Sequence, residues 1–152
     1  MRALCLTVAA LLAVAPARAA DRGGKVQYIG GTIAELAGAP KGRLLTINQH
    51  FLVFDSRKAH YMVPWERINL LEYGQKVNRR YAMAVVLSPL LVLSKSRKHF
   101  LTIGFTDENG RQQAMIFRVD KSDIRSLLVC LEAKTGLEVS YQDEEARKAG
   151  KG

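Results

Sequence analysis

The stretch that decides the fold is Phe100–Gly136, FLTIGFTDENGRQQAMIFRVDKSDIRSLLVCLEAKTG, in which a strand pattern gives way to a helix pattern. Phe100–Thr106 and Arg111–Val119 both alternate apolar residues with other residues, as strands with one buried face do. Asn109-Gly110 lies between them, and this dipeptide favours a tight turn. The stretch therefore begins with a predicted β-hairpin.

The second half of the same stretch predicts an amphipathic helix. Its apolar residues recur at helical spacing, namely Ile124, Leu127, Leu128 and Leu131. Asp120 or Ser122 can cap the start of this helix, and Gly136 stands where a C-terminal glycine belongs. A helix with a single apolar stripe needs a sheet to cover, and we expect the strands before it to form that sheet.

Short strand patterns also precede this stretch, at Lys25–Leu36, Leu44–Ile47, Phe51–Asp55, His60–Val63 and Ile68–Tyr73. Gly30-Gly31 interrupts the first of them, which indicates a bulge or a sharp bend. The pattern predicts a mainly β fold, an antiparallel barrel or sandwich of about seven strands whose open end is closed by the C-terminal helix.

The order of these elements resembles the pleckstrin-homology-like (PH-like) superfold, in particular GRAM-type and bacterial PH-like domains. Val63-Pro64-Trp65-Glu66-Arg67-Ile68 and the final strand and helix, Phe117–Gly136, carry the resemblance, which covers roughly residues 25–136. The resemblance implies a binding module for lipid headgroups or protein segments, without naming a ligand. An apolar insert between two strands departs from the common PH-like core.

The two ends of the chain differ from the expected domain at residues 25–140. Residues 1–19 have a basic Arg2, an apolar run at Ala3–Ala15 and a small-x-small cleavage motif at Ala17-Arg18-Ala19, and so resemble a secretory signal peptide. We expect the mature protein to be exported to the periplasm or cell envelope. Residues 141–152 (YQDEEARKAGKG) are charged and rich in Gly and Ala, which predicts a disordered tail.

Charge and cysteine content narrow the expected partners. The formal charge is +9, and it becomes +7 without Arg2 and Arg18. A basic exported protein favours anionic surfaces such as phospholipid headgroups, acidic polysaccharide or an acidic protein, and nucleic acid is not the expected partner there. After cleavage only Cys130 remains, so no disulfide can form within the chain, and its apolar neighbours favour a packed thiol.

The departure from the family pattern is an insert at residues 77–99. Its centre, Tyr81–Leu93 (YAMAVVLSPLLVL), has no charge, whereas Lys76 to His99 as a whole contains six Lys or Arg residues and no acidic one. Thirteen helical residues reach only about 20 Å, against about 30 Å of hydrocarbon, so a membrane-spanning helix is disfavoured. Ser88-Pro89 would also interrupt such a helix.

Three placements of the insert remain: an interfacial hairpin turning at Ser88-Pro89, a buried segment, and a patch for self-association. The basic flanks favour the interfacial hairpin, bound peripherally to an anionic membrane or envelope surface. The alternative is a module whose insert docks a protein partner or a second copy. The candidate membrane- or ligand-binding residues are Lys76, Arg79, Arg80, Tyr81, Val85, Val86, Leu87, Leu90, Leu91, Lys95, Arg97 and Lys98.

No pattern in the sequence predicts catalysis, a metal site or a cofactor. His50, His60 and His99 lack the spacing of metal ligands, and no glycine array resembles a phosphate loop or dinucleotide fingerprint. An enzyme would need a pocket built from residues distant in sequence, such as His50, His60 and Asp55. Trp65, beside Pro64, is expected in the core or at its rim. We therefore expect a non-catalytic binding module without a metal or cofactor.

Overall fold

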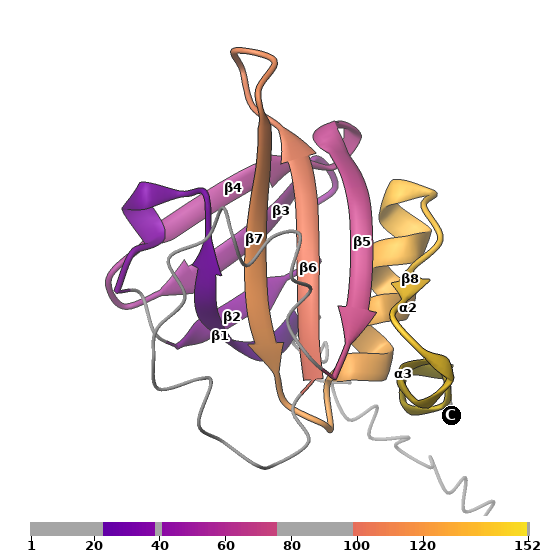
Figure 1. Cartoon of the computed structure of the whole chain (residues 1–152). Helices are drawn as coiled ribbons and strands as arrows, with labels where there is room; N and C mark the ends of the chain where they lie inside the picture. Colours follow the sequence, from indigo (N-terminus) through magenta and orange to yellow (C-terminus); the bar gives the residue numbers. More distant parts are fainter. Residues whose placement is uncertain (1–22, 39–40, 76–98, 152) are drawn as a thin grey trace, which may run out of the picture.

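The computed structural model describes residues 23–38, 41–75 and 99–151, and Figure 1 shows their arrangement. The strands are β1 (Gly23–Gly31), β2 (Gly42–Leu45), β3 (Phe51–Ser56), β4 (His60–Pro64), β5 (Ile68–Gly74), β6 (His99–Thr106), β7 (Gln112–Val119) and β8 (Ser140–Tyr141). The helices are α2 (Ile124–Thr135) and α3 (Glu144–Lys151), with short 3₁₀ turns η1 (Ala34–Leu36) and η2 (Trp65–Arg67). The expected signal peptide at 1–19 lies outside the described residues.

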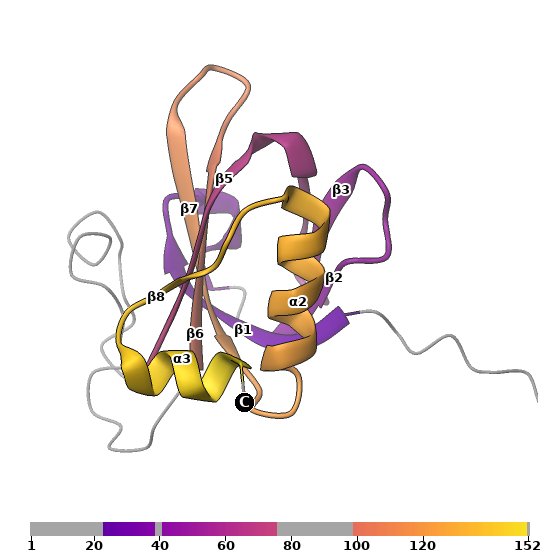
Figure 2. The same cartoon turned by 90° about the vertical axis from the view of Figure 1, so that its right-hand side faces the viewer.

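The mainly β class and the covering helix are confirmed, but the closed barrel or sandwich is corrected. One sheet of eight strands has the order β4-β3-β2-β1-β7-β6-β5-β8, and its two edge strands do not pair with each other. It is also mixed, because β8 runs parallel to β5, whereas the other neighbours are antiparallel. Figure 2 shows α2 lying along the opening between the two halves of the sheet. A closed barrel would require strand pairing across this opening, and the helix fills it instead.

Strand β1 joins the two halves of the sheet. Residues 23–26 pair with β2, and residues 26–31 pair with β7. The predicted bulge is present, since the register with β7 shifts between Tyr28 and Gly30. Gly31 follows with φ 152°, and a Cβ there would lie 2.2 Å from the Ala114 carbonyl oxygen, so only glycine fits the site.

The hairpin and the helix follow the predicted pattern closely. The Asp107 carbonyl oxygen accepts the Gly110 amide at 3.1 Å, and Gly110 has φ 75°, so a tight turn ending in a left-handed glycine joins β6 to β7. Gly136 ends α2 with φ 71°, as predicted. Neither Asp120 nor Ser122 is the N-cap, however. Asp123 holds that position, and its carboxylate accepts the Lys25 amide of β1 at 2.8 Å instead of capping the helix.

The core lies between the inner face of the sheet and α2. Tyr28, Phe117, Leu101 and Tyr73 form one row across β1, β7, β6 and β5, and all four side chains are buried. The apolar stripe of α2 covers this face through Ile124, Leu127, Leu128 and Leu131. Trp65 is also buried, and its Nε1 donates to the Asn48 carbonyl oxygen at 3.0 Å, which confirms its place at the core.

The C-terminal residues are not the disordered tail that composition predicted. Tyr141 packs edge-on against Tyr73 with 6.0 Å between ring centroids, and α3 follows it. The Asp143 carboxylate accepts the Ala146 amide at 2.7 Å, which is an N-cap bond, and Ala146 is fully buried against the core. Cys130 on α2 is a free, half-buried thiol, so its packing is looser than predicted.

Candidate functional site

All the residues predicted to contact a membrane or ligand, from Lys76 to Lys98, lie outside the described residues. The structure does place the two points where that segment joins the fold. Gly74 at the end of β5 pairs with Phe100 near the start of β6. His99 was predicted to belong to the insert at 77–99, but it is the first residue of β6. The segment therefore leaves and re-enters the sheet at one end of two neighbouring antiparallel strands.

His99 and Tyr73 form a polar contact at this junction. Their rings stack with centroids 6.0 Å apart, and the Tyr73 hydroxyl is hydrogen-bonded to His99 Nδ1. Burial, together with the nearby Tyr141 and Asp143, raises the pKa of Tyr73 to about 12. Burial and the positive charge of Lys121 lower the pKa of His99. A protonated phenol can thus donate to a neutral imidazole at neutral pH.

Basic side chains gather at the same end of the molecule, and we call this set the basic end. Lys121 follows β7 beside His99, Arg118 pairs with Phe100, and α3 packs against β5. Figure 1 shows α3 beside the end of β5, at the end of the sheet where β7 also ends. The basic end consists of the exposed or partly exposed residues Lys25, Arg118, Lys121, Arg147, Lys148 and Lys151.

Acidic groups also lie at the basic end. Asp123 accepts bonds from the Lys25 amide and the Ser122 hydroxyl, which lower the pKa of its carboxyl group. Glu144 lies 3.7 Å from Arg147, one turn along α3. At the opposite end of the sheet, burial raises the pKa of Tyr61, and the nearby Glu35, Asp107 and Glu108 add to this shift. Arg111 and Arg67 pair with Asp107 and Glu108 there, at 3.2 Å and 3.7 Å, and the exposed Asp120 follows β7 at the basic end. Both ends of the sheet therefore carry charges of both signs.

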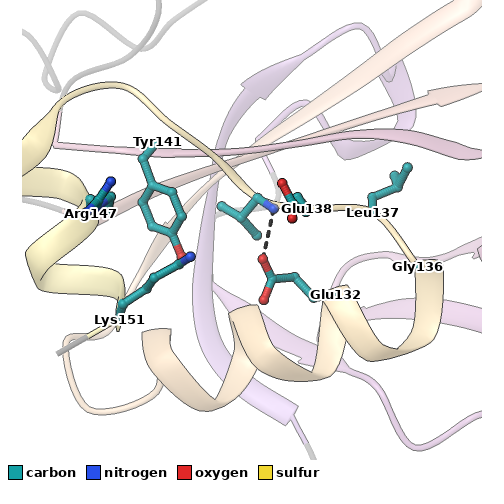
Figure 3. A pocket seen from close by; sticks show the side chains of 8 residues that line it. Glu132, Gly136, Leu137, Glu138, Tyr141, Arg147 and Lys151 are labelled. Atoms are coloured by element: carbon teal, nitrogen blue, oxygen red, sulfur yellow. Dashed lines mark hydrogen bonds between the residues drawn. The ribbon is translucent and has the colours of Figure 1, made fainter.

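A hollow of about 510 Å³ lies between α2 and α3, and Figure 3 shows its lining. Glu132 already accepts the Val139 amide at 2.9 Å, and Lys151 Nζ lies 5.6 Å from the centre of the Tyr141 ring. Arg147 and Glu138 complete its charged lining. These side chains offer charge and hydrogen bonds but no nucleophile paired with a base.

The catalytic pocket considered from the sequence does not form. His60 Nδ1 lies 3.2 Å from Asp55 Oδ1, across β3 and β4. His50 precedes β3 at its other end, about 16 Å away at strand spacing, where it borders a separate hollow with Trp65 and Lys134. No group of three or more His, Cys, Asp or Glu side chains suited to a metal ion occurs in residues 23–38, 41–75 and 99–151.

Sequence reasoning missed the part of the basic end that α3 contributes. Arg147, Lys148 and Lys151 were assigned to a disordered tail because the segment is short and charged. Asp143 followed by Glu144, with Lys148 and Lys151 near the end, matches the charge order of a helix and could have identified it. Within the described ranges, no helix has the length and apolar character to cross a bilayer.

Comparison with protein-family models and with curated proteins found no match to this chain.

Proposed function

We propose that this protein is an exported, non-catalytic PH-like binding module that associates peripherally with an anionic membrane surface through the insert and its basic flanks. The observation that carries the proposal is that the insert and a group of basic residues lie at the same end of the sheet. The insert joins the sheet at Gly74 and His99, at the end where Lys121, Arg118 and the α3 cations lie. A surface bound by the insert would thus also meet the basic end.

The charges of the basic flanks favour such binding. Each Lys or Arg near an anionic surface contributes up to about 1 kcal/mol, so the six in the flanks give an upper bound of about 6 kcal/mol. Apolar burial of part of Tyr81–Leu93 would add to this, and two such contributions together suffice for reversible anchoring.

The PH-like assignment is supported by the order of the elements. Among the residues that the structure describes, seven strands precede α2, and α2 lies along the opening of the sheet as the resemblance implies. The eighth strand and α3 extend this pattern beyond residue 136, where the resemblance ends. A binding role follows from the resemblance only as an expectation, because one fold supports many functions.

Sedimentation of the mature protein with vesicles tests the proposal. Vesicles of phosphatidylcholine alone should bind weakly, whereas vesicles with phosphatidylglycerol should bind tightly at low salt and lose binding as salt rises. Replacing Arg79, Arg80, Arg97 and Lys98 by Gln should weaken binding, and so should Lys121→Gln, Lys148→Gln and Lys151→Gln together, by roughly ten- to a hundredfold.

The matched control removes the same charge elsewhere. Arg57, Lys58 and Lys134 are exposed and belong to the β3–β4 turn and the end of α2. Replacing these three by Gln changes the net charge as much as the second variant does, but should leave vesicle binding within about twofold. Equal losses for both triple variants, or no binding to anionic vesicles at low salt, would exclude the proposed membrane contact.

A second candidate, a protein-docking or self-association module, is favoured by one observation on the sheet. β4 is an edge strand, and its Met62 is 52% exposed. An edge strand with an exposed apolar side chain can pair with another chain. Light scattering of the mature protein distinguishes this candidate, since a monomer at all concentrations would rule out self-association.

A further inference from the structure

The outer face of the sheet carries a second set of buried residues, which we call the outer patch: Ile29, Phe100, Thr102, Ala114 and Ile116. Ile116 is 0% exposed, Thr102 is 3% exposed and Phe100 is 7% exposed. They point away from the core, because their neighbours along β6 and β7, such as Leu101 and Phe117, point into it. None of the five belongs to the core cluster around α2.

The described elements do not account for this burial. Gly30, Ile116, Thr102 and Glu72 form one row across β1, β7, β6 and β5, so the patch spans neighbouring strands. Figure 2 shows α2 on the other side of these strands and α3 across their lower ends. No helix or strand within the described ranges lies over the patch. The Gln142 side chain lies over Gly74, the partner of Phe100 in β5, but not over the middle of the patch. Ile116, at 0% exposure on this sheet face, requires further atoms above it.

The apolar insert is the segment best placed to supply them. It joins β5 at Gly74 to β6 at His99, and both strands border or form the patch. Two antiparallel neighbours need a connection of only about two to five residues, whereas residues 76–98 separate these. The uncharged run Tyr81–Leu93 lies in the middle of that connection, within reach of Phe100.

The other apolar segment is placed less well. Ala3–Ala15 lies in the expected signal peptide, and its chain enters β1 at Gly23. That end of β1 pairs with β2, whereas β1 meets β7 only from Val26 onward. Removal of residues 1–19 would also leave the mature protein without this cover.

We propose that the outer patch is the docking face for the apolar segment Tyr81–Leu93 of the same chain. In water the segment packs on β6, β7 and β1, and its basic flanks remain at the basic end. The inference goes beyond the proposed function, since it concerns where apolar side chains lie without lipid. Vesicle binding and docking are measured separately, so either can fail alone.

Thiol labelling tests the proposal. In mature protein carrying Cys130→Ser, a cysteine is introduced by Thr102→Cys beneath the proposed docked segment, or by Val129→Cys at a 63% exposed control position. A water-soluble maleimide should label the first thiol at least about tenfold more slowly than the second. Replacing residues 81–93 with a Gly/Ser linker should remove that difference, while circular dichroism verifies the fold.

A milder variant tests the proposal if the linker protein does not fold. Serine at Val85, Val86, Leu90 and Leu91 keeps the chain length and should increase labelling of the Thr102→Cys thiol while Val129→Cys is unchanged. Slow labelling in every variant would overturn the proposal, as would protection seen only in the precursor. Protection that falls on dilution in parallel with dissociation would assign the patch to a second copy instead.

Discussion

Both faces of the β5–β6–β7–β1 half-sheet contain fully buried side chains, but these are covered by different means. On the inner face Phe117 is fully buried, and α2 lies over it. On the outer face Ile116, its neighbour in the chain, is equally buried with no described element above it. The inner cover comes from the next element in sequence, whereas the outer cover must come from a segment elsewhere in the chain or beyond it. The burial of Phe117 therefore depends on α2, whereas the burial of Ile116 depends on another segment.

The largest expected effect tests the inner face. Phe117→Ala removes a side chain that contacts Phe54 at 5.2 Å and Tyr28 at 5.7 Å between ring centroids. The free energy of unfolding should fall by about 3–5 kcal/mol, as in other large-to-small core changes. Chemical denaturation measures it. The loss should be the same after residues 81–93 are replaced by a Gly/Ser linker. A smaller loss in the linker protein would mean that the inner face also depends on the segment.

The next effect separates the two faces directly. Ile116→Ala should cost about 2–4 kcal/mol of unfolding free energy in the intact chain, because the side chain is fully buried. In the linker protein the same change should cost under about 1 kcal/mol, since the side chain would then face water. A double-mutant cycle from denaturation curves gives the coupling between residue 116 and the segment. Equal losses in both backgrounds would show that the segment does not cover Ile116.

The inner face is also the part of the fold that the sequence predicts well. Alternation in Phe100–Thr106, a helical stripe from Ile124 and a glycine at 136 are local patterns, and each of them appears in the structure. Closure of the sheet is not a local property, which explains why the barrel was wrong. β8 is a two-residue strand without a recognisable pattern, and its parallel pairing with β5 depends on Tyr141 packing against Tyr73.

The candidate site divides in the same way. Its flanking charges are visible in the sequence, but the basic end combines Lys121, Lys25 and the α3 residues, which only the folded chain brings together. The outer patch was invisible for a further reason. Phe100, Thr102 and Ile116 occupy the positions that an ordinary two-layer fold exposes, and Thr102 is not an apolar residue at all.

A smaller effect weakens the inner cover alone. Gly136 ends α2 in the left-handed region, where a side chain is strained, although no atom lies within 4 Å of a Cβ built there. Gly136→Ala should therefore cost about 1 kcal/mol of unfolding free energy through backbone strain alone. Thermal unfolding gives the change. Labelling of the Thr102→Cys thiol should not respond, and a parallel increase in labelling would mean that the two covers are coupled.

The smallest effect concerns the junction between β5 and β6. Because the folded pKa of His99 lies below its ordinary value of 6.5, the unfolded chain binds a proton more readily than the folded one. The stabilisation is present above about pH 6.5 and is lost as the pH falls through the lower folded pKa. His99→Gln should flatten the decline in melting temperature between about pH 7 and pH 5. An unchanged decline would assign it to other groups.

Strand β1 has a consequence for the time course of folding. Its first half pairs with β2, which is close in sequence. The pairing of Tyr28 with Phe117 instead joins residues about 90 positions apart in the chain. Closing a loop of that size costs about 4 kcal/mol of chain entropy before its contacts are gained. Formation of the β1–β7 ladder is therefore expected to limit the folding rate, so that the β2–β4 half remains open until β7 is available.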